Sequence, residues 1–165
     1  MKTMRIPIIY PIIACLICAL DQAIKSGIRS LPEHVPFFTI PGILELTRYT
    51  NTGAAFSMLT GHSAFLALLS SLLLGAMIIV MLKSIQLYSE VRVTLSVLVG
   101  AGAGNLLDRI LFGGVTDYIR LLWIPFPVFN LADLCITVSV AVLSYCIITG
   151  RLDRHPEETV YGTED

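Results

Sequence analysis

The sequence predicts an all-α membrane protein with four transmembrane helices and both termini in the cytoplasm. Of its 165 residues, 55% are hydrophobic and only 14% are charged, and the mean hydropathy is +0.80. This composition departs far from the soluble average and is typical of a membrane protein. Two further observations support that fold class: the chain contains four long uncharged segments, and three of them are polar at an end that falls on the same side of the membrane.

The four uncharged segments predict the transmembrane helices. Segment 64–82 has 19 residues, close to the roughly 20 that cross a hydrocarbon core. Segments 6–20, 93–107 and 134–148 have 15 residues each, so polar residues must complete these three helices. The first segment follows Lys2 and Arg5 and alone resembles a secretory signal peptide. The three later segments favour a permanent helix instead.

Polar residues gather at one end of three predicted helices. They follow the first and third segments and precede the fourth: Asp21, Gln22, Lys25, Asn105, Asp108, Arg109, Asn130 and Asp133. In an up-and-down arrangement these ends lie together. The 11 Lys and Arg residues divide six to five between the two sides, a weak bias that strengthens when Lys25 and Arg109 are counted with the cluster. It places both termini in the cytoplasm and the polar cluster at the outer face.

Two outer connections join the predicted helices. The first carries three prolines and the alternating stretch 43–49, which predicts a short strand or two and a small outer sheet. The second, 112–128, contains Gly113, Gly114, two prolines and Trp123, which is typical of an interfacial loop. We therefore expect one membrane domain over 1–150 with a β-rich insertion at about 29–60, and a disordered cytoplasmic tail over 151–165.

The outer polar cluster contains the ionisable residues that are candidates for catalysis. It holds four acids and two cations: Asp21, Asp108, Asp117, Asp133, Lys25 and Arg109. Ionisable groups in membrane helices usually face the bundle interior and mark functional sites. Asp21 lies four residues before Lys25, and Asp108 adjoins Arg109. These pairings leave Asp117 and Asp133 without a dedicated cation, although Arg120 offers Asp117 another partner. Two carboxylates in a poorly solvated site share one proton, as in aspartic proteolysis, with no metal or cofactor.

Three other functions fit parts of the sequence. Cys15 and Cys18 form a C-x-x-C that would suit a membrane thiol oxidoreductase, but cysteine in an apolar helix usually behaves as a small hydrophobe. The outer cluster could also be the ion site of a small transporter, which predicts polar groups nearer the midplane. Ser57 with Lys25 could imitate a Ser-Lys protease.

Several ligand classes are disfavoured by the sequence. A net charge of -1 argues against nucleic acid, and the three histidines show no zinc-ligand spacing. Gly100 and Gly102 begin a dinucleotide-like pattern, but Asn105 occupies its third glycine position. Gly100 and Gly104 instead predict close helix packing.

Five ordered motifs carry a resemblance to a known family. They are Asp21-Gln22-Ala23-Ile24-Lys25, Asn51-Thr52-Gly53-Ala54-Ala55-Phe56-Ser57, Gly104-Asn105-Leu106-Leu107-Asp108-Arg109, Gly114-Val115-Thr116-Asp117-Tyr118 and Phe129-Asn130-Leu131-Ala132-Asp133. Together with four apolar segments, they resemble the signature of lipoprotein signal peptidase (signal peptidase II), a bacterial membrane aspartic protease. One departure is Thr116, where the family often has valine, and we expect it to change little.

The resemblance implies a fold, a site and a substrate. It implies a four-helix membrane protein of the bacterial inner membrane with a periplasmic β-cradle, and Asp117 with Asp133 as the catalytic dyad. The supporting or substrate-binding residues are then Asp21, Lys25, Asn51, Gly53, Asn105, Asp108, Arg109 and Asn130. The implied partners are membrane lipids and prolipoproteins that carry diacylglycerol on the lipobox cysteine, cleaved just before it by a monomer that globomycin inhibits. Asp117 is expected on an outer loop that closes on substrate.

Overall fold

The computed structural model describes residues 7–53, 59, 61–83 and 87–152. In this part of the chain four helices are long and apolar enough to cross a membrane. They are α1 (Ile9–Arg29), α2 (Ser63–Lys83), α3 (Ser89–Phe112) and α4 (Leu131–Ile148). The four-helix prediction is confirmed. The predicted disordered tail falls on residues 153–165, outside the described ranges, apart from residues 151 and 152.

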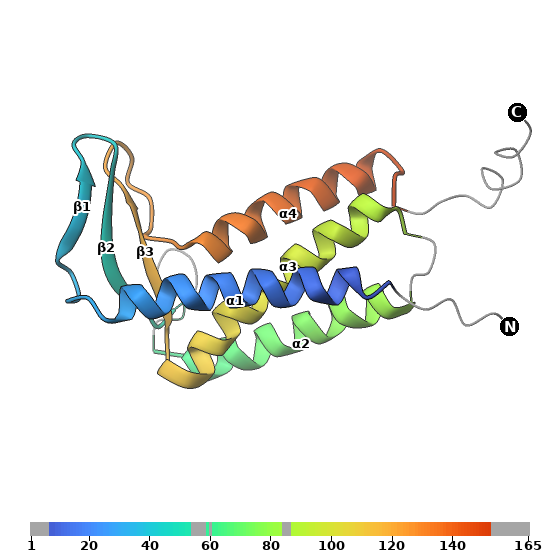
Figure 1. Cartoon of the computed structure of the whole chain (residues 1–165), viewed down its shortest axis with the longest axis horizontal. Helices are drawn as coiled ribbons and strands as arrows, with labels where there is room; N and C mark the ends of the chain where they lie inside the picture. Colours follow the sequence, from blue (N-terminus) through green and yellow to red (C-terminus); the bar gives the residue numbers. More distant parts are fainter. Residues whose placement is uncertain (1–6, 54–58, 60, 84–86, 153–165) are drawn as a thin grey trace, which may run out of the picture.

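Polar residues extend two of the helices, as the short uncharged segments required. α1 continues through Asp21 and Lys25 to Arg29, and α3 continues through Asp108 and Arg109 to Phe112. α4 begins two residues before Asp133. The polar residues of these three helices therefore lie at one end of the bundle (Figure 1).

Helix α3 is the centre of the bundle and packs against α1, α2 and α4 (Figure 1). Its contact with α1 is close because two glycines face that helix. A Cβ on Gly100 would overlap the carbonyl oxygen of Ala14, and one on Gly104 would overlap the carboxylate of Asp21. The predicted packing role of Gly100 and Gly104 is confirmed. Gly104 also leaves room for a buried acid.

We expect Gly104→Ala to destabilise the protein, because the added methyl group must displace the Asp21 carboxylate or separate α1 from α3. Overpacking of this kind lowers the free energy of unfolding by about 1–3 kcal/mol. Gly75→Ala in α2 is the matched control, since a Cβ there meets nothing within 4 Å. Unfolding in detergent, followed by circular dichroism, measures both variants. Equal stability of Gly104→Ala and Gly75→Ala would contradict the close contact.

A three-stranded antiparallel sheet lies at the end of the bundle where α1 ends and α4 begins (Figure 1). Its strands are β1 (Pro36–Ile40), β2 (Leu44–Asn51) and β3 (Val115–Leu121), in the order β1-β2-β3. Arg48 of β2 joins the sheet to α1, because its Nη1 donates to the carbonyl oxygens of Arg29 at 2.7 Å and Leu31 at 3.0 Å. The predicted small sheet is confirmed.

The third strand corrects the prediction for the second outer connection. Residues 112–128 were expected to form a loop, but Val115–Leu121 is a strand that pairs along β2, with Asn51 opposite Val115 and Tyr49 opposite Asp117. Asp117 is therefore held on a sheet and only 2% exposed. The sheet thus also extends beyond the insertion expected at about 29–60.

Candidate active site

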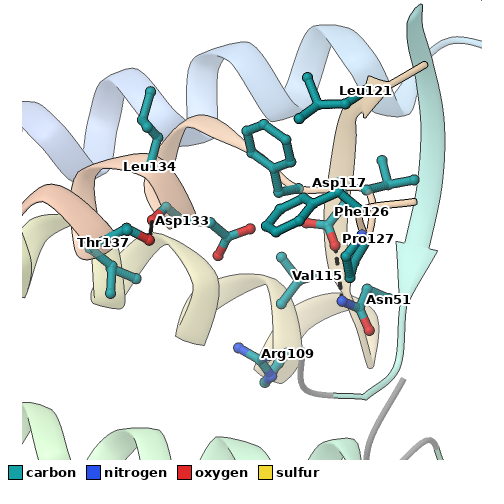
Figure 2. A pocket seen from close by; sticks show the side chains of 13 residues that line it. Asn51, Arg109, Val115, Asp117, Leu121, Phe126, Pro127, Asp133, Leu134 and Thr137 are labelled. Atoms are coloured by element: carbon teal, nitrogen blue, oxygen red, sulfur yellow. Dashed lines mark hydrogen bonds between the residues drawn. The ribbon is translucent and has the colours of Figure 1, made fainter. Parts of the chain in front are cut away.

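Two carboxyl groups face one cavity from different elements. Asp117 projects from β3 and Asp133 from the first turn of α4, and both line a cavity of about 430 Å³. Figure 2 shows them on opposite sides of this cavity, with Arg109 of α3 below and Asn51 of β2 beside Asp117. The structure therefore brings together the two acids that charge counting singled out.

Backbone pairing sets the position of Asp117. On one side β3 pairs with β2. On the other side the amides of Tyr118 and Ile119 both donate to the carbonyl oxygen of Phe129, at 3.0 and 2.8 Å. The Tyr118 hydroxyl also accepts from the amide of Leu131 at 3.2 Å, which satisfies a free donor at the start of α4. The strand that carries Asp117 and the helix that carries Asp133 are thus joined directly.

Asp133 is fixed by a capping box at the N-terminus of α4. The Asn130 side-chain oxygen accepts from the Asp133 amide at 3.0 Å, and Asp133 Oδ2 accepts from the Asn130 amide at 3.1 Å. The box satisfies two donors of the first turn. The positive end of the helix dipole favours a negative charge at this position. Asp133 is only partly buried.

Three asparagines hold the two carboxyl groups. Asn51 Nδ2 donates to Asp117 Oδ2 at 2.9 Å, and Asn130 Nδ2 donates to Asp117 Oδ1 at 2.7 Å. Asn105 Nδ2 donates to Asp133 Oδ1 at 2.8 Å. Each carboxyl group therefore receives side-chain amide donors while its remaining lone pairs stay available to the cavity.

The orientation of each asparagine is determined by a donor on its carbonyl oxygen. The Asn51 oxygen accepts from the Gly53 amide at 2.9 Å, and the Asn130 oxygen accepts from the Asp133 amide. The Asn105 oxygen accepts from Lys25 Nζ at 2.6 Å and from Asn130 Nδ2 at 3.2 Å. Because an amide cannot turn its oxygen toward both partners, every NH2 group is directed at an aspartate.

A buried ion-pair cluster lies beneath this network. Lys25 Nζ is 2.8 Å from Asp21 Oδ2 and 3.6 Å from Asp108 Oδ2, and Arg29 Nη1 is 3.1 Å from Asp108 Oδ1. Lys25 and Asp108 have no exposed side-chain surface. The predicted pairing of Asp21 with Lys25 is confirmed. Two acids and two cations balance each other in this cluster, as buried charges require.

One predicted pairing is wrong, and one alternative pairing is not observed. Asp108 pairs with Arg29 and Lys25 rather than with Arg109, because successive residues of a helix point in different directions. Arg109 Nη2 donates to the Gly53 carbonyl oxygen at 3.3 Å and lines the cavity. The alternative partner for Asp117, Arg120, lies 3.6 Å from Glu45. In the part of the chain that the structure describes, the salt bridges do not include Asp117 or Asp133.

Burial changes the acidity of Asp117. Desolvation, together with the neighbouring charge of Asp133, raises the pKa of Asp117 to about 7 from its ordinary value of 3.8, while the amides of Asn51 and Asn130 act in the opposite direction. Two nearby carboxyl groups in a poorly solvated cavity resist ionising together. At neutral pH the pair can therefore hold one proton.

Four residues around the site are not among the predicted site residues, although Gln22 was placed in the polar cluster: Gln22, Arg29, Thr116 and Tyr118. Gln22, Lys25 and Arg29 recur at helical spacing on α1, which was the available signal. Ser57, the Ser-Lys alternative, lies outside the described residues. Cys15 and Cys18 are free cysteines. Among the residues described, no group of three His, Cys, Asp or Glu side chains could hold a metal ion.

Comparisons with known proteins identify the family of this chain. The family profile described as Signal peptidase (SPase) II matches residues 13–149. The lipoprotein signal peptidase of Listeria monocytogenes serotype 4a is 34% identical over 146 residues, which cover 86% of this chain and 95% of the relative. That of Streptococcus thermophilus strain CNRZ 1066 is 33% identical over 134 residues, covering 81% and 88%.

Two solved structures share the fold. A bacterial membrane enzyme determined by the in meso method at 2.3 Å resolution has a TM-score of 0.78 at 26% identity and covers 94% of this chain and 93% of its own. A second, at 1.9 Å resolution, has a TM-score of 0.73 at 30% identity and covers 84% and 91%. With the family profile matching from α1 to the end of α4, these comparisons show that the chain belongs to the signal peptidase II family.

Proposed function

We propose that this protein is an aspartic endopeptidase whose catalytic dyad is Asp117 and Asp133. As a member of the signal peptidase II family with lipoprotein signal peptidases as relatives, it removes the signal peptide from prolipoproteins. The observation that carries the dyad is geometric: two carboxyl groups without a salt-bridge partner among the described residues line one cavity, and amide donors fix both.

The dyad works with one shared proton. Asp133, at the N-terminus of α4 and only partly buried, accepts a proton from the attacking water. Asp117 is buried and holds the proton, which supports the oxyanion and then reaches the leaving amine. The water adds directly to the scissile carbonyl, so no covalent intermediate forms.

Charge balance supports a single proton. The lower cluster is neutral, because Lys25 and Arg29 offset Asp21 and Asp108. Arg109 is the cation that remains at the cavity, where it lies with the two dyad acids. One proton on the dyad then leaves one negative charge opposite Arg109. Neutrality favours this protonation state in a poorly solvated site.

The supporting residues act on the dyad or on the substrate. Asn51, Asn105 and Asn130 orient the carboxyl groups, and Gly53 fixes the Asn51 amide. Asp21, Lys25 and Asp108 join α1 to α3, and Asp108 also joins α3 to β3. Arg109 Nε is buried with no hydrogen-bond partner in the described part of the chain. We assign the part of the Arg109 guanidinium that lines the cavity to a carbonyl oxygen of the substrate backbone.

The walls of the cavity suit an apolar substrate next to a lipid. Beside the acids it is lined by apolar side chains: Leu121, Phe126, Pro127, Val128, Leu134 and Ile136. Such a wall accommodates the apolar end of a signal peptide and the diacylglyceryl group on the following cysteine. We propose cleavage just before that lipidated cysteine, by a monomer in the bacterial inner membrane with both termini cytoplasmic and the site at the outer face.

The pH dependence of cleavage tests the dyad. Because the pKa of Asp117 is raised to about 7, its proton is present below that pH and is lost as the pH rises through it. We expect kcat/KM for a diacylglyceryl-modified prolipoprotein to fall on the alkaline side with a midpoint near pH 7. The rate is measured in detergent micelles with the enzyme shown to stay folded at each pH.

Arg120→Gln provides the control, since Arg120 pairs with Glu45 and its side chain is 48% exposed. In that variant kcat/KM should fall with rising pH at the same midpoint as in the wild type. A rate that stays constant up to about pH 9 in the wild type would be incompatible with a protonated Asp117 in the reaction.

A further inference from the structure

Arg29 is the last residue of α1, and three groups fix its guanidinium. Its Nη1 donates to Asp108 Oδ1 at 3.1 Å and to the Thr116 hydroxyl at 3.4 Å, and its Nη2 donates to the Gln22 side-chain oxygen at 3.4 Å. The guanidinium also lies over the Phe112 ring, 4.3 Å from its centroid. A planar, stacked fork of donors therefore joins the end of α1 to the end of α3 and to β3.

Asp108 carries this connection to the backbone of β3. Its Oδ2 accepts from the Thr116 amide at 2.8 Å, while Oδ1 accepts from Arg29 and from Gln22 Nε2 at 2.9 Å. Asp108 has no exposed side-chain surface, so its orientation depends on these protein donors. Thr116 immediately precedes Asp117. Arg29 is thus linked to Asp117 through the Asp108 carboxylate and Thr116.

We propose that Arg29 is a positioning residue for Asp117, acting through Asp108 and Thr116. The inference rests on the proposed role of Asp117 in the dyad. Arg29, Asp108 and Thr116 are absent from the described side chains that line the cavity, which include Asp117 and Asp133. Arg29 therefore does not contact the reacting atoms. Its effect is to hold the start of β3 where the Asp117 carboxyl group meets the cavity.

The position of β3 matters because small displacements of catalytic groups are costly. Moving a catalytic group by about 1 Å reduces rate by up to about 100-fold without a change in binding contacts. The Thr116 hydroxyl is part of this arrangement. A valine at this position would keep the backbone hydrogen bond from the residue 116 amide to Asp108, but it would lose the hydroxyl that accepts from Arg29. The expectation that Thr116 changes little therefore requires a test alongside Arg29.

The test compares Arg29→Lys and Arg29→Gln with Arg120→Lys and Arg120→Gln. Lysine keeps the charge but cannot reach Asp108, Thr116 and Gln22 in one plane. For both Arg29 variants we expect kcat on a diacylglyceryl-modified prolipoprotein to fall about 10- to 100-fold, with KM within about twofold of wild type. Both Arg120 variants should keep wild-type kcat, because that arginine pairs with Glu45 elsewhere on the sheet.

Thr116→Val tests whether Arg29 acts on Asp117 through Thr116. Alone it should lower kcat about two- to tenfold, and in the Arg29→Lys background it should add nothing, because the accepting contact is already lost. Wild-type kcat in folded Arg29→Lys overturns the proposal, as does an independent, multiplicative effect of Thr116→Val. Failure of even Arg29→Lys to fold also overturns it, since Arg29 would then act on folding.

Asp117→Asn separates this inference from the proposed function. If Asp117→Asn is inactive while Arg29→Lys is unaffected, only the positioning role fails. If Asp117→Asn retains cleavage, the dyad itself fails, whatever the result for Arg29.

Discussion

Lys25→Met is expected to cause a large loss of stability. Its ammonium lies within 2.8 Å of Asp21 Oδ2 and 2.6 Å of Asn105 Oδ1, with no exposed surface. Methionine has a side chain of similar length to lysine but carries no charge. The substitution therefore leaves the buried Asp21 carboxylate without its cation. Breaking such a pair from one side lowers the free energy of unfolding by about 3–5 kcal/mol. Thermal unfolding in detergent at fixed protein concentration measures it.

The same change should also reduce cleavage in whatever protein remains folded. Lys25 holds the Asn105 oxygen, and that bond directs the Asn105 NH2 group to Asp133. The double variant Asp21→Asn/Lys25→Met is the control, because removing both charges restores much of the lost stability. A Lys25→Met protein as stable as wild type, or a double variant less stable than Lys25→Met, would contradict a paired, buried Lys25.

The helices and one ion pair could be predicted from the sequence because both depend on local spacing. An uncharged segment of transmembrane length needs no knowledge of its neighbours. Asp21 and Lys25, four residues apart on a helix, meet by the geometry of the helix itself. The sequence also predicted that the polar ends of three helices lie on the same side of the membrane, because successive helices cross it in opposite directions.

The partner of Asp108 could not be read from the sequence. Adjacency to Arg109 suggested a pair, but neighbouring helical residues diverge, and the true partners Arg29 and Lys25 come from α1. Only the packing of α1 on α3 brings them together. Gly104 permits that contact, yet glycine spacing alone does not specify which helix faces it.

Strand β3 was missed because its hydrogen-bond partners are distant in the chain. Val115, Thr116, Tyr118 and Ile119 are residue types that strands favour, but the adjacent glycines and prolines suggested a loop. Pairing with β2 on one side and with Phe129 on the other makes the segment a strand. As a result Asp117 belongs to a three-stranded sheet, and the expectation that it lies on an outer loop is wrong.

The dyad substitutions are expected to have the largest effect on activity. Asp133→Asn cannot accept a proton from water, and Asp117→Asn cannot supply one to the leaving amine. Each removes an acid–base step, so cleavage should fall about 10³-fold or more. Each change keeps the volume of the side chain and gives up one accepted hydrogen bond, at a cost of about 1–3 kcal/mol, so both proteins should still insert and fold.

The most direct measurement is cleavage of a diacylglyceryl-modified prolipoprotein by Asp117→Asn, Asp133→Asn and the control Glu45→Gln, each purified in detergent and shown to be folded. Glu45 is a carboxylate of the same sheet that pairs with Arg120 and is absent from the described lining of the cavity. A dyad predicts that both aspartate variants are inactive and that Glu45→Gln cleaves at the wild-type rate. Retained cleavage by either folded aspartate variant would contradict it.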